Sequence, residues 1–431
     1  MRKAAIALTA FLGGLLIVLG LGAGSASAQE GGEAVQGTLV SAGQPVAGVK
    51  IDVKAEGGAA VGSAVSDDTG KWRVGVPSGG RYEISLDTGT LPEGVGLINP
   101  DQQTLHVQVF SGNVRTVLFR LAPGGVSEFK SESKYSRIPQ LIFEGFNLGL
   151  IIALAAVGLS LIYGTTGLTN FAHGELVTFG ALMAFWFSEI DLPFLPRLNL
   201  IYAAALAVFV AGIFGYGQDR WFWSWLRRRG TGRIGMMIVS IGLAIVLRNV
   251  YQIRFGGGTR QFIDYATQPG TDYGPITTNP KTLISMCLAI VVILAIGFAL
   301  LSTRLGKATR AVADNPALAE ASGIDVDRVV RVVWTLGAAV AGLAGIILAM
   351  GQGVSYLMGF QILLLVFAGV TLGGLGTAFG ALVGSLVVGL FVQLSTLWVA
   401  EELKIASALL LMIIVLLIRP QGILGRRERV G

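Results

Sequence analysis

Three polar side chains interrupt an otherwise apolar part of the sequence and are the first candidates for chemistry. Asn170, His173 and Glu175 stand in the glycine-containing run YGTTGLTNFAHGE, between two apolar spans. Irregular backbone and ionisable groups at membrane depth are tolerated only where they face protein or a wet cavity. The run therefore predicts a translocation path lined by Asn170, Phe171, His173, Gly174 and Glu175. The same residues are also compatible with a tight turn in which Asn170 caps the next helix.

A second interruption, LGGLGTAFG at residues 372–380, is rich in glycine. It contains no Gly-Lys-Ser/Thr, and its spacing fits neither the Walker nor the dinucleotide pattern, so it is not a phosphate-binding loop. Small residues instead allow helices to approach one another closely. We expect Gly373, Gly374 and Gly376 to lie beside the same path. Because the chain carries no Walker lysine motif, it is not expected to hydrolyse ATP itself.

A short polar segment, DNPALAEASG at residues 314–323, has the start and stop signals of a helix. Asp314 or Asn315 can cap its first turn, Pro316 suits that turn, and Gly323 can end it. Basic residues bracket the segment, namely Arg304, Lys307, Arg310, Arg328 and Arg331. A helix too polar for lipid and too short to cross it should lie on the membrane surface, where it can receive force from a soluble partner.

The elements that must position these residues belong to a membrane protein. Only 13% of the 431 residues are charged and 53% are hydrophobic, whereas a soluble domain has about 25% charged residues. The net charge of +6 is therefore interpreted as a topology signal and not as nucleic-acid affinity. The single cysteine, Cys287, excludes an intrachain disulfide, and the presence of only two histidines, His106 and His173, argues against a histidine-based metal site.

Nine apolar spans are predicted, and some of them are short for a full crossing of about 20 residues. The spans cover residues 141–163, 176–187, 200–216, 234–253, 282–301, 329–350, 362–375, 378–397 and 405–418. The expected fold class is thus mainly α, a polytopic membrane helical bundle of about nine crossings.

The distribution of basic residues predicts which loops face the cytoplasm. Arginines gather in residues 218–233, around residues 314–323 and near the C-terminus, whereas residues 189–199 and 254–281 are richer in Gly, Pro and Asp. Cytoplasmic loops carry the excess of Lys and Arg. An odd number of crossings, with the N-terminal domain outside and the C-terminus in the cytoplasm, satisfies this rule at every large loop.

The N-terminal part is of a different kind. Residues 1–28 have a basic start, an apolar centre and the ending Ala-Ser-Ala, which predicts a secretory signal peptide; a retained first transmembrane helix is the alternative. Residues 29–122 predict a small all-β sandwich of short alternating strands. Those strands are expected at residues 35–40, 48–53, 71–76, 81–86, 104–109 and 114–121. A polar linker at residues 123–139 leads to the membrane domain at residues 140–431.

The turn pattern of this domain resembles a known fold. GQPVAGVKIDV, SDDTGKWRVGVP and GRYEISLD are similar to the transthyretin-like, carboxypeptidase-regulatory-like fold. Asp67 and Asp68 suit turn capping better than a calcium loop. The expected role is that of an extracytoplasmic interaction module.

Two features of the membrane part are expected to be interfacial. Arg248, near the outer end of the fourth span, is compatible with facing a pore or with snorkelling toward the interface, and snorkelling is expected. Trp221, Phe222, Trp223 and Trp225 adjoin arginines and predict an interfacial aromatic belt.

Four motifs, in order, resemble a family. They are GLTNFAHGE after the first span, ATRAVADNPALAEASGIDVDRV before the sixth, LGGLGTAFGALVG, and IRPQGILG near the C-terminus. Over residues 141–425 the chain resembles the permease subunits of branched-chain amino acid ABC transporters. Permeases of the same group that carry urea and short amides resemble it nearly as well. The N-terminal leader and β-domain depart from the typical member.

The resemblance implies an importer in the cell membrane. Its parts would be a second, homologous permease, two cytoplasmic ATPase subunits that bind the ATP, and an extracytoplasmic substrate-binding protein; the chain itself would hold no cofactor and catalyse no reaction. In the family, the segment matching residues 310–323 is the coupling helix that docks on the ATPase. We carry that role to Ala313, Asp314, Asn315, Ala319, Glu320 and Gly323.

Two other classes of function are compatible with parts of the sequence. An ion-coupled carrier needs intramembrane carboxylates as relay groups, and Glu175 is the nearest candidate. A membrane-anchored receptor would use the spans only as an anchor, which leaves their number and the polar segment at residues 314–323 without a purpose. An ATP-driven permease that works by alternating access accounts for both.

Overall fold

A computed structural model describes residues 33–41, 44–56, 58–92, 94–97, 103–109, 114–123, 134–189, 198–262, 270–400, 403–419 and 421–424. The chain forms two compact units, one of which holds the strands between residues 23 and 133 and the other the helices from residue 134 onward. The predicted signal peptide and the arginines at the C-terminal end lie outside the described residues.

The smaller unit consists of three sheets that share one apolar core. The sheet orders are β10-β1-β6, β3-β2-β11-β8 and β5-β4-β7-β9. Their strands are β1 (Ala34–Thr38), β2 (Val40–Ser41), β3 (Gln44–Pro45), β4 (Lys50–Ala55), β5 (Ala60–Val65), β6 (Lys71–Gly75), β7 (Gly80–Leu86), β8 (Val95–Leu97), β9 (Thr104–Val109), β10 (Val114–Val117) and β11 (Arg120–Pro123). Strands β4 and β7 pair antiparallel, whereas β1 and β10 pair parallel.

Strand β7 shows why this part folds as it does. Its alternate residues Tyr82, Ile84 and Leu86 are buried in the core, because successive side chains of a strand point to opposite faces. Strand β5 was not predicted from the sequence. Its Ala, Gly and Ser residues are mostly exposed, so it carries no clear alternation.

The turn before β6 is built around Asp67. Its Oδ1 accepts hydrogen bonds from Thr69 N at 2.8 Å, Thr69 Oγ1 at 2.7 Å and Lys71 N at 2.9 Å. The Thr69 hydroxyl, followed by the Lys71 amide, lowers the pKa of this exposed carboxyl. Asp67 therefore organises the turn, as its sequence context indicates.

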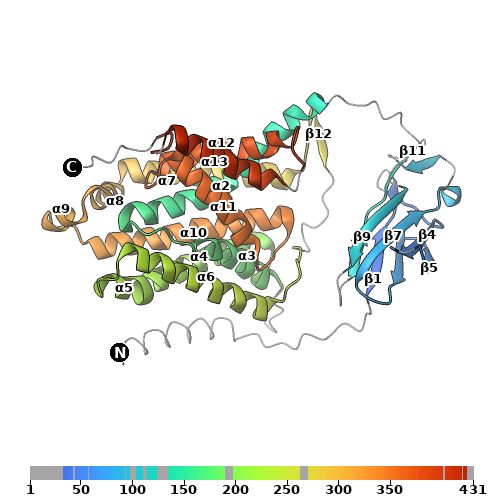
Figure 1. Cartoon of the computed structure of the whole chain (residues 1–431), viewed down its shortest axis with the longest axis horizontal. Helices are drawn as coiled ribbons and strands as arrows, with labels where there is room; N and C mark the ends of the chain where they lie inside the picture. Colours follow the sequence, from blue (N-terminus) through green and yellow to red (C-terminus); the bar gives the residue numbers. More distant parts are fainter. Residues whose placement is uncertain are drawn as a thin grey trace. The chain divides into compact units, whose positions relative to one another are not determined.

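The larger unit is a bundle of helices (Figure 1). Its helices are α2 (Ile138–Thr166), α3 (His173–Glu189), α4 (Leu200–Gly217), α5 (Ser224–Arg228), α6 (Arg233–Phe255), α7 (Pro280–Ser302), α8 (Arg304–Asp314), α9 (Pro316–Ala321), α10 (Val326–Gln352), α11 (Met358–Gly373), α12 (Ala378–Ser395) and α13 (Lys404–Ile418). The short 3-10 helix η3 (Lys134–Arg137) precedes α2.

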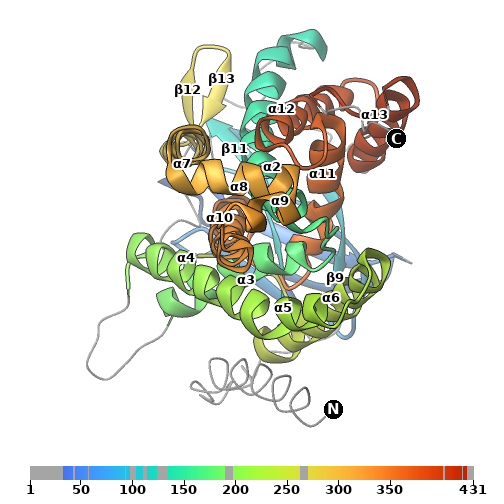
Figure 2. The ribbon, with the colours of Figure 1, turned by 90° about the vertical axis from the view of Figure 1, so that its left-hand side faces the viewer.

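Helices α2 and α10 form the centre of the bundle. Helix α2 packs against α12, α10, α11 and α7, and α10 packs against α2, α3 and α4, as the end-on view in Figure 2 makes clear. Glycines permit the close approach. A Cβ atom on Gly158 of α2 would lie 2.7 Å from the carbonyl oxygen of Gly337 on α10, so a larger residue would force these helices apart.

Among the described residues, six helices are long and apolar enough to cross a membrane, namely α2, the continuous helix from α4 to α5, α6, α7, α10 and α12. Helices α11 and α13 are apolar but shorter, and α3 has 17 residues. A count of nine crossings thus remains a prediction, while the mainly helical membrane unit and the β region before it are observed.

Two predicted loops contain regular structure. Residues 218–233 were expected to form a loop, but the helix continues from α4 through a π-helical turn, η4 (Gln218–Trp223), into α5. Residues 218–228 are amphipathic and rich in arginine, so they do not form the apolar run by which a membrane helix is predicted. Within residues 254–281, β12 (Thr271–Tyr273) and β13 (Ile276–Thr278) form an antiparallel hairpin.

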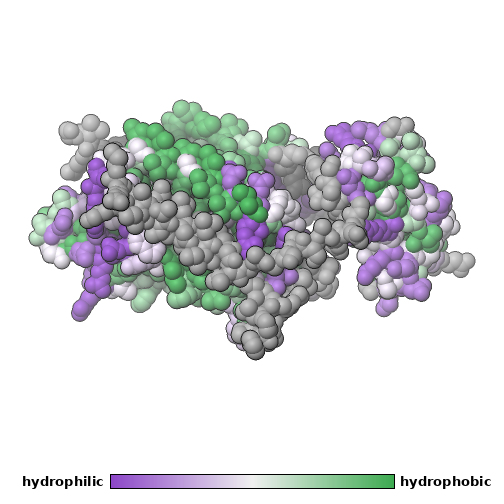
Figure 3. Space-filling model, turned by 90° about the horizontal axis from the view of Figure 1, so that it is seen from below, coloured by the Kyte–Doolittle hydropathy of each residue, from purple (hydrophilic) through white to green (hydrophobic). Residues whose placement is uncertain are grey.

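The surface of the helical unit matches a lipid environment. Hydrophobic side chains cover its middle, and hydrophilic ones gather at the end that carries α8 and α9 (Figure 3). Helices α6 and α7 contribute exposed apolar residues, among them Ile238, Ile245, Leu294 and Phe298. Such a large apolar surface marks contact with lipid or with another membrane subunit.

Candidate functional site

The first helix break lies between α2 and α3. Helix α2 ends at Gly167, whose φ of +64° is left-handed and suits a glycine. Asn170 Oδ1 then accepts a hydrogen bond from Ala172 N at 3.0 Å, and Phe171 N donates to Ser240 Oγ of α6 at 3.0 Å. The asparagine therefore organises the turn into α3, which is the second of the two roles that the sequence allowed.

An ion pair ties the start of α3 to α6. Both Nε and Nη2 of Arg248 donate to Oε1 of Glu175, at 3.1 and 2.9 Å. The Glu175 side chain is 1% exposed and that of Arg248 is 19% exposed. The Arg248 guanidinium also lies 4.0 Å from the ring centroid of Phe360 on α11. The expectation that Arg248 snorkels is therefore wrong, because a buried carboxylate holds it in the bundle.

His173 faces the interior of the bundle. Its Nε2 lies 2.9 Å from the carbonyl oxygen of Ala155 on α2 and donates to it, so in the neutral ring Nδ1 is left as an acceptor. Within the described part of the chain, His173 Nδ1, Asn170 Nδ2 and Glu175 Oε2 are buried atoms without a hydrogen-bond partner. Three such atoms within six consecutive residues are unusual for a settled core.

The break is closed by glycine contacts. Gly174 and Gly359 approach so closely that a Cβ atom on either would clash with the other's carbonyl oxygen. Thr178 Oγ1 accepts a hydrogen bond from Gly359 N at 3.1 Å across the same contact. Asn170, His173 and Glu175 are therefore buried against protein in this conformation and do not line an open channel.

The second helix break, between α11 and α12, lies against the end of α2 beside the first break. A Cβ atom on Gly164 of α2 would lie 3.0 Å from the carbonyl oxygen of Gly376, and Gly373 is in similarly close contact with Gly380. Of the three predicted path residues here, Gly373 and Gly374 are buried and Gly376 is half-buried. Tight packing explains Gly373, whereas Gly374 and Gly376 adopt positive φ angles of 113° and 80°, which favour glycine.

The C-terminal tail completes the second break, a role that the sequence analysis missed. Ile423 N donates to Leu372 O at 2.7 Å, and Leu424 N donates to Gly373 O at 2.9 Å. The last carbonyl groups of a helix need such partners. The tail motif IRPQGILG thus satisfies the end of α11.

Helix α9 lies within the predicted segment, residues 314–323, and a further helix, α8, directly precedes it. Asn315 caps α9, because its Oδ1 accepts from Leu318 N at 3.1 Å. Gly323, with φ of +84°, follows the end of α9. Of the six predicted coupling residues, five are exposed and Ala319 is buried, at 4% exposure. Leu318, which was not predicted, is 65% exposed beside them.

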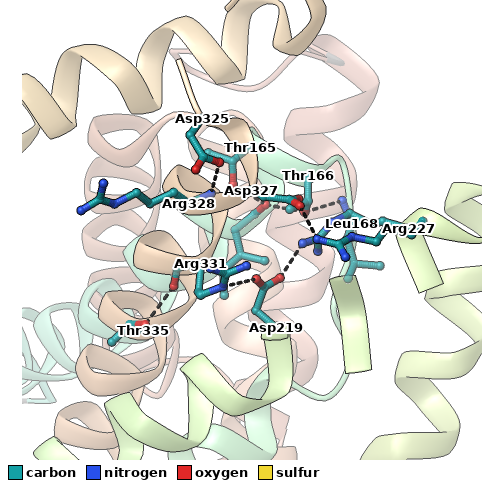
Figure 4. A network of polar contacts seen from close by, with 12 residues as sticks. Thr165, Thr166, Leu168, Asp219, Arg227, Asp325, Asp327, Arg328, Arg331 and Thr335 are labelled. Atoms are coloured by element: carbon teal, nitrogen blue, oxygen red, sulfur yellow. Dashed lines mark hydrogen bonds and ion pairs between the residues drawn. The ribbon is translucent and has the colours of Figure 1, made fainter. Parts of the chain in front are cut away.

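A charged network anchors this end of the bundle (Figure 4). Asp219 of η4 accepts a hydrogen bond from Arg227 at 2.6 Å and lies 3.9 Å from Nε of Arg331 on α10. Arg228 of α5 pairs with Asp327 at the start of α10 at 2.9 Å. These contacts fix η4 and α5 against the helix that directly follows α9.

The predicted aromatic belt is only partly interfacial. Trp221 is exposed. Trp223 is fully buried and stacks on Trp334 of α10 with ring centroids 5.5 Å apart. The expectation of a surface belt is therefore wrong for Trp223, whose burial strengthens the packing of η4 against α10.

The described residues contain no cluster of three or more His, Cys, Asp or Glu side chains able to hold a metal ion. What the bundle offers is a set of broken helices at its centre and an exposed helix pair at one end. That combination fits a membrane transport protein.

Comparison with known proteins specifies the class. Residues 141–418 match the family described as branched-chain amino acid transport system / permease component, and the chain belongs to that family. It is 30% identical to the high-affinity branched-chain amino acid transport system permease protein LivH of Escherichia coli K12, over 67% of this chain and 96% of LivH. It is 31% identical to the permease protein BraD of the corresponding system of Pseudomonas aeruginosa, over 68% of this chain and 97% of BraD. A probable LivH of Methanocaldococcus jannaschii is 30% identical, over 64% of this chain and 89% of that protein.

The chain is thus a multi-pass membrane permease and not an enzyme. The relatives cover the helical unit, and the β unit before it lies outside the family match.

Proposed function

We propose that the chain is the transmembrane permease subunit of an ATP-driven importer of branched-chain amino acids. Its similarity to LivH and BraD over nearly their whole length supports this proposal. In the complex we envisage a second homologous permease, two cytoplasmic ATPase subunits and an extracytoplasmic binding protein. The pair α8–α9 carries the coupling role, because it presents an exposed polar face at one end of the bundle and connects α7 directly to α10.

Coupling follows from the way α8 and α9 are attached. Helix α10 begins at Val326, three residues after Gly323, and lies at the centre of the bundle. A push on α9 is therefore transmitted to α10 and, through the contacts of α10, to α2, α3 and α4 as a rigid-body shift. The ion pairs of Arg227 and Arg331 with Asp219 make η4 and α5 move with α10.

The same shift supplies a role for the first break. We propose that the translocation path opens at Asn170, His173 and Glu175 when α3 moves relative to α6 and α11. The unpartnered atoms of these residues in the closed arrangement support the idea, since another conformation or a bound substrate would satisfy them.

An ion-coupled carrier is less well supported. Such a carrier needs a carboxylate that loads and releases a cation. Glu175 is the candidate, and Arg248 already neutralises it. ATP-independent uptake by the purified chain in proteoliposomes would favour this alternative. If the transporter preferred urea or a short amide to leucine, the chain would instead be a urea or amide permease of the same family.

The coupling role is tested by co-purification with the ATPase subunits. Glu320→Lys and Gly323→Trp alter the exposed surface of α9 and should reduce recovery of the ATPase while membrane insertion continues. Glu189→Lys, at the end of α3, provides a matched charge reversal away from α9. Equal ATPase recovery from all variants would contradict the docking assignment.

A further inference from the structure

A polar cleft lies at the end of the bundle remote from α8 and α9. It has a volume of about 170 Å³ and is enclosed by the first turns of α2 and α7 and the last turns of α10 and α12. Helix α7 runs from this cleft to α8, which places the two sites at opposite ends of one long helix. The cleft is separate from the break at residues 167–175 described above.

Opposite charges line the cleft. Glu144 comes from α2 and Lys281 from α7. Glu144 Oε1 accepts a hydrogen bond from Gln140 at 2.7 Å, and Lys281 Nζ donates to the carbonyl oxygen of Met350 at 3.3 Å. These bonds hold both charged groups at the cleft. A carboxylate accepts about four hydrogen bonds, so Glu144 can accept more than the one from Gln140.

The same lining contains three amide side chains. Asn147 of α2, Gln352 of α10 and Gln393 of α12 face the cleft. Within the described residues, no hydrogen bond to these side-chain amides is found. Polar groups gathered between membrane helices carry an energetic cost and mark a site for a polar ligand or ion.

The lining also contains aliphatic side chains. Leu148 and Ile151 of α2 and Ile347 and Leu348 of α10 contribute to it. A cleft that combines a carboxylate, an ammonium, free amides and branched aliphatic side chains matches the parts of an aliphatic α-amino acid. Its ammonium would meet Glu144, its carboxylate would meet Lys281 and the amides, and its side chain would contact the aliphatic residues of the lining.

We infer that this polar cleft is a binding site for a free zwitterionic α-amino acid with an aliphatic side chain. The inference rests on the proposed function and deepens it, because urea lacks both the charges and the apolar part that this lining would recognise. The site would receive substrate before the central break opens.

The test measures ligand binding to the full chain in nanodiscs by saturation-transfer NMR, which detects weak binding. The probes are L-leucine, L-leucinamide, which lacks the carboxylate, and 4-methylpentanoate, which lacks the ammonium. The wild-type protein should prefer leucine to each analogue by about tenfold or more, as expected for a charge-assisted hydrogen bond.

The variants should change this preference selectively. Lys281→Met should abolish the preference for leucine over leucinamide, and Glu144→Gln should abolish the preference for leucine over 4-methylpentanoate. Lys404→Met and Glu189→Gln are matched controls outside the cleft and should keep both preferences. A variant that merely failed to fold would lose all three ligands together, so the selective pattern is specific to the proposed contacts.

Three results would overturn the inference. They are no leucine binding to the wild-type chain, retention of both preferences in the two cleft variants, and loss of leucine binding when phosphatidylethanolamine is added to phosphatidylglycerol nanodiscs. The third result would assign the cleft to a zwitterionic lipid headgroup. ATP-dependent leucine uptake by the assembled transporter tests the proposed function separately. If uptake occurs but the two cleft variants keep both ligand preferences, only the assignment of the cleft is refuted. If uptake does not occur, the proposed function is refuted.

Discussion

Arg248 on α6 donates two hydrogen bonds to one carboxylate oxygen of Glu175 on α3, although the two residues are 73 positions apart in the sequence. Helices α3 and α6 otherwise make few contacts. The ion pair is thus a principal link between α6 and the centre of the bundle, and the stacking of Arg248 on Phe360 extends that link to α11.

Breaking this pair from one side should destabilise the protein. Arg248→Met leaves Glu175 buried without its counter-charge and should lower the free energy of unfolding by about 3–5 kcal/mol. The double variant Glu175→Gln/Arg248→Met removes both charges and should recover much of that loss. Thermal unfolding in detergent, followed by tryptophan fluorescence, measures the difference. A double variant no more stable than Arg248→Met would show that the buried charge is not the cause.

The close contact between α3 and α11 predicts a size limit at Gly359. Gly359→Ala places a Cβ atom against the backbone of Gly174 and against Thr178, so α11 must move away. We expect a loss of about 1–3 kcal/mol, as for other overpacked cores. Gly242→Ala on α6 is the control, because a Cβ atom there meets nothing within 4 Å. The control should be neutral or stabilising by up to about 1 kcal/mol. Equal melting temperatures for the two variants would contradict the tight contact.

The sequence predicts some of these features and not others. Apolar spans locate the helices to within a few residues, because lipid requires long apolar runs; α2 and α10 are examples. Capping residues such as Asn315 and Gly323 are equally local signals, and they give the correct place for α9. Features that depend on pairing between distant residues leave no such signal.

The pairing of Arg248 with Glu175 is one feature of this kind. An arginine near a helix end is equally compatible with snorkelling until the fold brings a carboxylate to it. The burial of Trp223 against Trp334 and the capping of α11 by Ile423 and Leu424 also depend on tertiary structure. Single-sequence reasoning therefore finds the break at residues 163–175 but not the contacts that close it.

Two ion pairs at the α8–α9 end should differ in their energetic importance. Asp219 is fully buried, whereas the side chains of Arg228 and Asp327 are 63% and 45% exposed. Asp219→Ala leaves Arg227 and Arg331 partly buried without a counter-charge and should destabilise the protein by about 3 kcal/mol. Arg228→Met removes an exposed pair and should cost about 1 kcal/mol or less. Chemical denaturation in detergent measures both changes, and a reversed order would refute the assigned importance of Asp219.

The turn at Asp67 makes the β unit sensitive to acid. Hydrogen bonding to Thr69 and Lys71 lowers the pKa of Asp67 in the folded state, so its ionised form favours folding. This contribution is fully present above the unfolded pKa of about 3.9 and is lost as the pH falls through the lower folded value. Asp67→Asn should remove that part of the acid sensitivity. Amide hydrogen exchange at Thr69 and Lys71 in the full chain reports it, and an identical pH profile in the variant would contradict the prediction.

Helix α7 connects the β12–β13 hairpin to α8–α9, so it determines whether these two features lie on the same side of the membrane. A labelling experiment can test this arrangement in the cell. Helix α7 has 23 residues, and at about 1.5 Å per residue it spans roughly 34 Å, enough to cross the hydrocarbon core once. The hairpin β12–β13 precedes α7 and α8–α9 follows it, so these two features should lie on opposite sides of the membrane.

In a Cys287→Ser background, Tyr273→Cys in the hairpin and Ala317→Cys in α9 place one thiol at each end, and both positions are exposed. An impermeant maleimide applied to intact cells should label Tyr273→Cys at once and Ala317→Cys only after the membrane is permeabilised. Because arginines gather beside α9, the positive-inside rule places α9 in the cytoplasm and the hairpin outside. Labelling of Ala317→Cys on intact cells would place α9 outside, and there no cytoplasmic ATPase could reach it.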